Sequence, residues 1–178
     1  MRYSRLPGSI GLAIALSLSA SCTMARTPAN QQSAAVGVLP ADARALRYGA
    51  SAPEVFNNPE MAAKVRALFG SDWSPAATPG GGQLEYGAAQ YFPASSSLRM
   101  LRMNGRDYIA ISGCVPVACA THRGLVLIDG GGDELWARLD EGGFSRYYGH
   151  GPAMTNAALV SPAFIDSAWR AVERVDRA

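Results

Sequence analysis

The chain has 178 residues, of which 48% are hydrophobic and 17% are charged, and its formal net charge at pH 7 is +2. Removing Arg2 and Arg5 with an N-terminal export signal lowers Lys+Arg from 16 to 14, which equals the 14 Asp+Glu. A mature chain without net charge and without a Lys/Arg cluster argues against nucleic-acid binding.

The N-terminus is predicted to be an export signal that covers residues 1–22. Arg2 and Arg5 form its positive end, and the apolar run from Ile10 to Ala20 is too short to span ~30 Å of hydrocarbon as a resident helix. Ser19-Ala20-Ser21-Cys22 then approximates a lipobox, which predicts a lipid on Cys22. Cleavage after Ala25 is the competing interpretation.

Export would place the other two cysteines in an oxidising compartment. If Cys22 carries a lipid or leaves with the signal, Cys114 and Cys119 stay, and a disulfide between them is expected. Because Thr23 rather than Asp follows Cys22, analogy with lipoprotein sorting favours the outer membrane. The predicted location is the periplasm, with an outer-membrane anchor through lipidated Cys22.

Residues 23–39 are small and polar and are predicted to be a flexible tether, followed by a single domain over residues 40–178. A short helix is predicted to begin at Ala41. A second helix is predicted from Asn58-Pro59, an N-cap and first-turn pair, to Gly70. Its expected inner face comprises Met61, Ala62, Val65, Leu68 and Phe69. Ser74 to Gly82 is a Pro/Gly-rich loop.

From about Gln83 the hydrophobic pattern changes to that of strands. Leu98–Met103 and Tyr108–Ser112 flank Asn104-Gly105, which is a strong hairpin signal. A second hairpin is predicted from Gly124–Asp129 and Glu134–Asp140 across Gly130 to Gly132, and Phe144–Tyr148 is predicted to add a strand. Between the two hairpins lies the segment Cys114-Val115-Pro116-Val117-Ala118-Cys119.

Ser161-Pro162 is predicted to open a C-terminal helix, in which Asp166 and Arg170 have the spacing of an i,i+4 ion pair. The fold class that follows is α+β: an antiparallel sheet of about five strands flanked by helices, with one short disulfide-closed loop between strands. The residues expected on the inner face of this helix are Phe164, Ile165, Ala168, Trp169 and Val172, and all three tryptophans, Trp73, Trp136 and Trp169, are expected in or beside the core.

The strand Tyr108-Ile109-Ala110-Ile111-Ser112-Gly113-Cys114, the four-residue loop, Cys119 and the apolar strand from Gly124 to Ile128 resemble the inhibitor of vertebrate lysozyme (Ivy) family. The resemblance covers about Phe56 to Leu139. It implies a periplasmic α+β protein, often dimeric, that inserts its disulfide-closed loop into the cleft of a c-type lysozyme. In that family a loop histidine approaches the two catalytic carboxylates of the enzyme.

The resemblance implies that the partner-binding residues here are Val115, Pro116, Val117 and Ala118. Val117 stands where the family has its histidine, and it has neither a donor nor an acceptor. Burying it against two carboxyl groups would desolvate them without replacing their hydrogen bonds, so weaker binding or a different contact is expected. The expected partner is a c-type lysozyme or an endogenous lytic transglycosylase; the alternative is a non-inhibitory structural or assembly lipoprotein of the envelope.

A metal site or a catalytic site would be an alternative to a binding loop. Cys114, Cys119, His122 and His150 form a conceivable zinc set, but oxidised thiols would not bind the metal, and no metal or cofactor is expected. Cys114 is an equally poor nucleophile because its surroundings supply nothing to lower the pKa of a thiol. No Gly-x-Ser-x-Gly motif is present, so the chain is not expected to be an enzyme.

Tyr147, Tyr148 and His150 lie at the end of the last predicted strand and just after it. They could form a recognition patch, but aromatic packing of an edge strand is the preferred interpretation.

Overall fold

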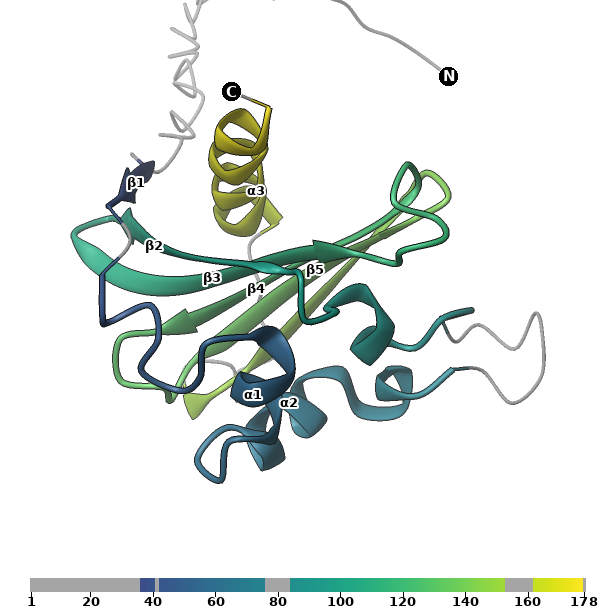
Figure 1. The fold of residues 1–178 in the computed structure, drawn as a ribbon, viewed down its shortest axis with the longest axis horizontal. Coiled ribbons are helices and arrows are strands. Elements are labelled where there is room, and N and C mark those ends of the chain that lie inside the picture. Colours follow the sequence, from purple (N-terminus) through teal and green to yellow (C-terminus); the bar gives the residue numbers. More distant parts are fainter. Residues whose placement is uncertain (1–35, 41, 76–83, 153–161, 178) are drawn as a thin grey trace, which may run out of the picture. The chain divides into compact units, whose positions relative to one another are not determined.

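A six-stranded antiparallel sheet with the order β1-β2-β3-β4-β5-β6 is the centre of the fold (Figure 1). The computed structural model describes residues 36–40, 42–75, 84–152 and 162–177. Contacts divide the chain into residues 1–31 and 32–178, and only the second unit contains described residues. The predicted export signal and Cys22 therefore lie outside the described residues, as do the first part of the tether and most of the loop from Ser74 to Gly82.

The α+β prediction is confirmed, with one strand more than expected. The added strand is β1, whose residues 36–39 were predicted to belong to the tether. Val36 and Val38 alternate along it and pair with Met103 and Leu101 of the neighbouring strand, which gives this stretch a place at the sheet edge. The strands are β1 (Val36–Leu39), β2 (Ser97–Met103), β3 (Arg106–Cys114), β4 (His122–Asp129), β5 (Leu135–Glu141) and β6 (Phe144–His150).

The turn between β2 and β3 is the predicted Asn104-Gly105 turn. Asn104 and Gly105 have φ values of 52° and 78°, and Met103 pairs directly with Arg106. Positive φ at both central residues is the geometry of a tight two-residue hairpin, which Asn and Gly adopt readily. The predicted register of this hairpin is thereby fixed by local sequence.

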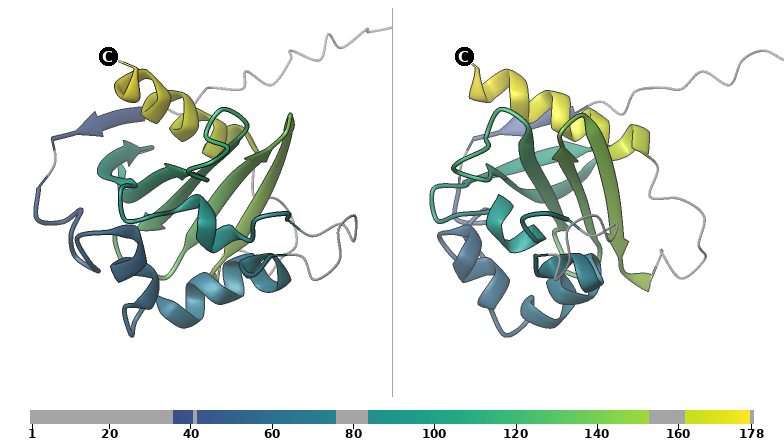
Figure 2. Two further views of the ribbon diagram at one scale, coloured as in Figure 1. Left: turned by 45° about the vertical axis from the view of Figure 1, so that its right-hand side comes forward. Right: turned by 90° about the vertical axis from the view of Figure 1, so that its right-hand side faces the viewer.

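The two faces of the sheet are covered by different helices (Figures 1 and 2). We call the first core the apolar cluster between the sheet and the N-terminal helices, and the second core the cluster between the sheet and the C-terminal helix. The alternation of β3 divides its side chains between them, with Ile109 and Ile111 in the first core and Tyr108 and Ala110 in the second. The helices on the first face are α1 (Ala52–Asn57), α2 (Ala62–Phe69), η1 (Gly70–Trp73) and η2 (Ala88–Tyr91), and α3 (Pro162–Asp176) lies on the second.

The helix predicted to begin at Ala41 is not formed. Residues 43–48 are a series of turns, in which Ala45 donates to the Asp42 carbonyl and Leu46 to the Ala43 carbonyl, three residues back in each case. The helix in this region is α1. Ser51 caps it, Pro53 lies in its first turn, and the Glu54 carboxylate accepts a hydrogen bond from the Ala50 amide at 2.9 Å. The Ser51 hydroxyl in turn accepts from the Glu54 amide at 3.4 Å, so Ser51 and Glu54 form a variant of the capping box in which the carboxylate binds the amide one residue before the cap.

The helix predicted from Asn58 begins slightly later. Asn58 caps a first turn by accepting the Glu60 amide at 2.9 Å, and α2 then runs from Ala62 to Phe69. Gly70 ends the helix with a φ of 55°, as predicted. The buried members of its predicted inner face are Met61, Val65, Leu68 and Phe69.

The C-terminal helix forms as predicted, with Ile165, Ala168 and Trp169 buried against the sheet. The expected pair of Asp166 with Arg170 is replaced. Asp166 instead accepts from Arg138 of β5 at 2.8 Å, so this carboxylate ties the helix to the sheet.

Candidate functional site

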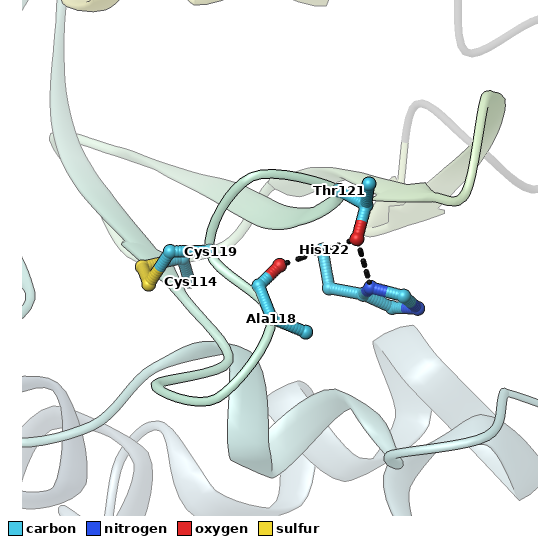
Figure 3. Close-up of a disulfide and its surroundings, with 5 residues drawn as sticks. All are labelled: Cys114, Ala118, Cys119, Thr121 and His122. Carbon is cyan, nitrogen blue, oxygen red and sulfur yellow. Dashed lines mark hydrogen bonds between the residues drawn. A yellow bond between two sulfur atoms is a disulfide. The ribbon is translucent and has the colours of Figure 1, made fainter.

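The loop between β3 and β4 is closed at its base by the predicted disulfide between Cys114 and Cys119, whose Cα atoms lie 4.9 Å apart (Figure 3). Cys114 is the last residue of β3, and His122 is the first residue of β4. The disulfide therefore closes the connection between β3 and β4 with a covalent bond.

Two consecutive turns hold the loop backbone. The Ala118 amide donates to the Val115 carbonyl at 2.8 Å, and the Thr121 amide donates to the Ala118 carbonyl at 3.0 Å. Across the base, the Val115 amide donates to the His122 carbonyl at 3.0 Å. The disulfide and these hydrogen bonds fix the loop before any partner arrives, which lowers the entropy cost of binding.

The four predicted contact residues divide into an inward and an outward pair. Val115 is 1% exposed and belongs to the first core, and Ala118 packs partly buried against the same core. Pro116 is exposed, and Val117 is 84% exposed at the tip of the loop. Val115 and Ala118 thus support the loop from inside, while Pro116 and Val117 are the residues that a partner can reach.

His122 does not take the place of a loop histidine. Its Nδ1 lies 2.8 Å from the Thr121 hydroxyl (Figure 3). Its ring stands edge-on to Tyr86, with ring centroids 5.0 Å apart. A second aromatic contact joins it to Tyr91 at 6.1 Å. The imidazole is therefore a packing group at the base of the loop, on the side of the first core.

The conceived zinc set is not assembled. Cys114 and Cys119 are joined to each other, His122 pairs in register with Glu141, and His150 pairs with Leu135 at the other end of β5. Within the described ranges, no group of three or more His, Cys, Asp or Glu is placed to hold a metal ion.

A second exposed apolar residue lies beside the loop and was missed in the sequence. Phe144 begins β6 and is 77% exposed. The turn that precedes it contacts the loop, because the Gly142 amide donates to the Thr121 carbonyl at 3.1 Å, and the two connections rise together from one end of the sheet (Figure 1). The Gly142-Gly143 turn signal was available in the sequence, but the direction of the Phe144 side chain was not.

The aromatic residues of β6 serve the packing of the edge strand. Tyr148 packs against Phe69 of the first core with ring centroids 5.1 Å apart, and its hydroxyl donates to Asp72 at 2.8 Å. Burial, together with this hydrogen bond, raises the pKa of Tyr148 well above its usual value. Tyr147 donates to Asp166 of α3 at 3.0 Å on the opposite face. The two tyrosines are thus tied to opposite layers, as the preferred interpretation expects.

Comparison with known proteins adds no relative to this picture: no protein-family model matches the sequence, and no curated protein matches it. None of the helices in the described part of the chain has the length and apolar character needed to cross a membrane.

Proposed function

We propose that this chain is an exported, Ivy-like protein that binds a peptidoglycan-cleaving enzyme, either a c-type lysozyme or an endogenous lytic transglycosylase, through the loop from Cys114 to Cys119. The observation that carries the proposal is the 84% exposure of Val117 at the tip of a loop closed by a disulfide. Covering an apolar side chain that a fixed loop holds in solvent is favourable, so Val117 is a suitable contact for the apolar surface of a partner.

The contact differs from the one that a loop histidine would make. Val117 offers no hydrogen bond to a catalytic carboxylate. Phe144, which follows the neighbouring turn at the same end of the sheet, is a second exposed apolar side chain. We call Pro116, Val117 and Phe144 the apolar tip. The apolar tip suits the aliphatic and aromatic walls of a glycan cleft better than the carboxylates at its centre.

The alternative is a non-inhibitory structural or assembly lipoprotein of the envelope. It is favoured by the lack of any ionisable side chain from Val115 to Ala118 and by the inward packing of His122. Both functions share a location: we propose the periplasm, with Cys22 as a lipid anchor in the outer membrane. The intact mass of the exported protein tests the anchor, because lipidation adds the mass of acyl chains to a chain that begins at Cys22.

Inhibition of muramidase activity tests the proposed function. The full chain is titrated against several c-type lysozymes and a periplasmic lytic transglycosylase, and dose-dependent inhibition of at least one enzyme is expected. Val117→His, which supplies the missing imidazole, should strengthen inhibition of a lysozyme. Unchanged activity of every enzyme at high micromolar concentrations of the chain would exclude inhibition and favour the structural alternative.

A further inference from the structure

A cavity of about 450 Å³ lies between the C-terminal half of α3 and the sheet, on the face opposite the first core. Its floor includes Ser97, Ser112 and Leu125 from three neighbouring strands, and Trp169, Val172 and Glu173 of α3 contribute its roof. The volume is within the range of small-molecule sites in proteins. The cavity borders the disulfide and Pro116, and His122 is not part of its lining.

The sequence of the sheet explains the hollow. Elsewhere beneath α3, the large side chains of Leu101, Tyr108 and Trp136 fill the space between the two layers. Toward the loop end of the same face, Ser97 and Ser112 stand opposite each other in register, and their short side chains leave the space open. The helix continues over this end, so it covers a gap instead of a packed core.

Two ion pairs hold the sides of the cavity and cancel its charge. Arg123 of β4 binds Glu173, and Arg99 of β2 binds Asp176, so both carboxylates that line the cavity are neutralised by arginines from the sheet. The Arg123 guanidinium also lies over the Trp169 ring, 5.4 Å from its centroid. These arginines are already committed to carboxylates, which disfavours an anionic ligand, and the neutralised carboxylates disfavour a cation.

The remaining lining combines hydroxyl groups with apolar surface. Ser95, Ser97 and Ser112 can each donate and accept hydrogen bonds, whereas Leu125 and Val172 present aliphatic groups. A purely apolar ligand would strip water from the serines without replacing it, at a cost of about 1–3 kcal/mol for each buried hydroxyl.

We propose that this cavity binds a neutral saccharide of one or two pyranose rings. A pyranose has hydroxyls around its edge and C–H groups on its faces, and this is the combination that the lining offers. The inference goes beyond the proposed function, since no part of a partner enzyme takes part in it.

The test is a titration of the full chain with neutral disaccharides, namely N,N′-diacetylchitobiose, cellobiose and maltose, followed by NMR chemical shifts. Millimolar or tighter binding of at least one sugar is expected, with the largest shifts at Ser112, Leu125 and the Trp169 indole. Absence of shifts with all three sugars would overturn the proposal, and so would preferential binding of decanoate or glucose 6-phosphate at the same residues.

Filling the cavity should remove binding. Ser112→Leu should weaken binding of the responding sugar at least tenfold, and Ser95→Tyr, at an exposed position on the wall, makes the same test if Ser112→Leu does not fold. Leu46→Asp, at an exposed position outside the lining, should leave the affinity unchanged. Full sugar binding by a folded, filled variant would contradict the assignment. These measurements contain no enzyme, so a lack of sugar binding does not contradict the proposed function. A lack of enzyme inhibition likewise does not contradict sugar binding.

Discussion

Val115 and Val117 are chemically identical and two positions apart, yet one is 1% and the other 84% exposed. The turn from Val115 to Ala118 accounts for the difference, because both of its end residues pack toward the first core and its central residues project outward. The sequence alone treats all four loop residues as equivalent contacts. Only the packing beneath the loop shows that Pro116 and Val117 are the accessible pair.

The buried Tyr91 and the half-buried Tyr148 differ in the hydrogen bonding of their hydroxyls, so their phenylalanine variants should differ in stability. The Tyr91 hydroxyl is buried and lacks a hydrogen-bond partner among the described residues, whereas the Tyr148 hydroxyl donates to Asp72. Tyr148→Phe should lower the free energy of unfolding by about 1.5 kcal/mol, and Tyr91→Phe should leave it unchanged or raise it by up to about 1 kcal/mol. Urea denaturation at neutral pH measures both, and an equal loss in the two variants would refute the distinction.

The same tyrosines predict a loss of stability in alkaline solution. Burial raises the pKa of Tyr91 and of Tyr148 above the usual value near 10. Above that pH the unfolded chain releases protons that the folded chain retains, so stability is complete below about pH 10 and falls as the pH rises further. Between pH 9 and pH 11, the Tm of Tyr91→Phe should fall less than the Tm of the natural chain, because the variant lacks the contribution of one titrating hydroxyl. A parallel decline in both proteins would contradict the prediction.

Asp107 predicts a loss of stability in acid. Hydrogen bonds from Arg102, aided by Arg44, lower the pKa of Asp107, and the bond from Arg44 links the turns near residue 44 to the β2–β3 hairpin. Ionised Asp107 therefore stabilises the fold at pH values above its ordinary pKa near 3.8. This stabilisation is lost as the pH falls through the lower pKa of the folded state. Asp107→Asn should therefore lower Tm at pH 7 but have little effect at about pH 2. A Tm difference that is the same at both pH values would exclude this role.

At the scale of the elements, Gly113 allows β3 to pass beneath the segment that enters β2. A Cβ atom at this position would collide with the Ser96 hydroxyl and lie 2.5 Å from the Tyr91 carbonyl oxygen, and backbone cannot yield as a flexible side chain can. Gly113→Ala should lower the free energy of unfolding by about 1–3 kcal/mol. Gly37→Ala is the matched control, since a Cβ there meets nothing within 4 Å. Equal stability of the two variants in chemical denaturation would contradict the packing argument.

The disulfide contributes to the loop more than to the fold. Cys114 and Cys119 are separated by five positions, and the loop-entropy estimate for so short a bridge is roughly 2 kcal/mol. The double variant Cys114→Ser, Cys119→Ser should therefore stay folded with a modest fall in unfolding free energy, while amide exchange quickens from Val115 to Thr121. Complete unfolding, or unchanged exchange in the loop, would disagree with this account.

Elements with strong local signals were predictable, and those that depend on distant contacts were not. Asn104-Gly105 specifies its hairpin because the required positive φ values belong to these two residues. Val36–Leu39 is too short to identify as a strand without knowing that β2 offers it an edge. A helix was expected from Ala41, but residues 43–48 form turns, since the buried Ala45 and Tyr48 are positioned by the first core.

At the scale of the whole molecule, the α+β class followed from the order of the elements, whereas the surfaces did not. The apolar tip joins the β3–β4 loop to the turn before Phe144, and strand order alone brings these segments together. The cavity likewise depends on where α3 crosses serines from β2 and β3. The hydrophobic pattern of the sequence does not show where a helix will lie over a sheet.

Direct binding is the closest test of the proposal that the apolar tip contacts a peptidoglycan-cleaving enzyme. The affinity of the full chain for each enzyme of the panel is measured by calorimetry for the natural sequence, for Val117→Asp and for Leu46→Asp. Leu46 is the matched control because it is 51% exposed and its neighbour Arg47 binds the Gly130 carbonyl, at the end of β4 away from the loop. We predict micromolar or tighter binding that Val117→Asp weakens at least tenfold, or about 1.4 kcal/mol, and Leu46→Asp leaves unchanged. Equal affinity of the two variants, or no binding of the natural chain to any enzyme, would contradict the account.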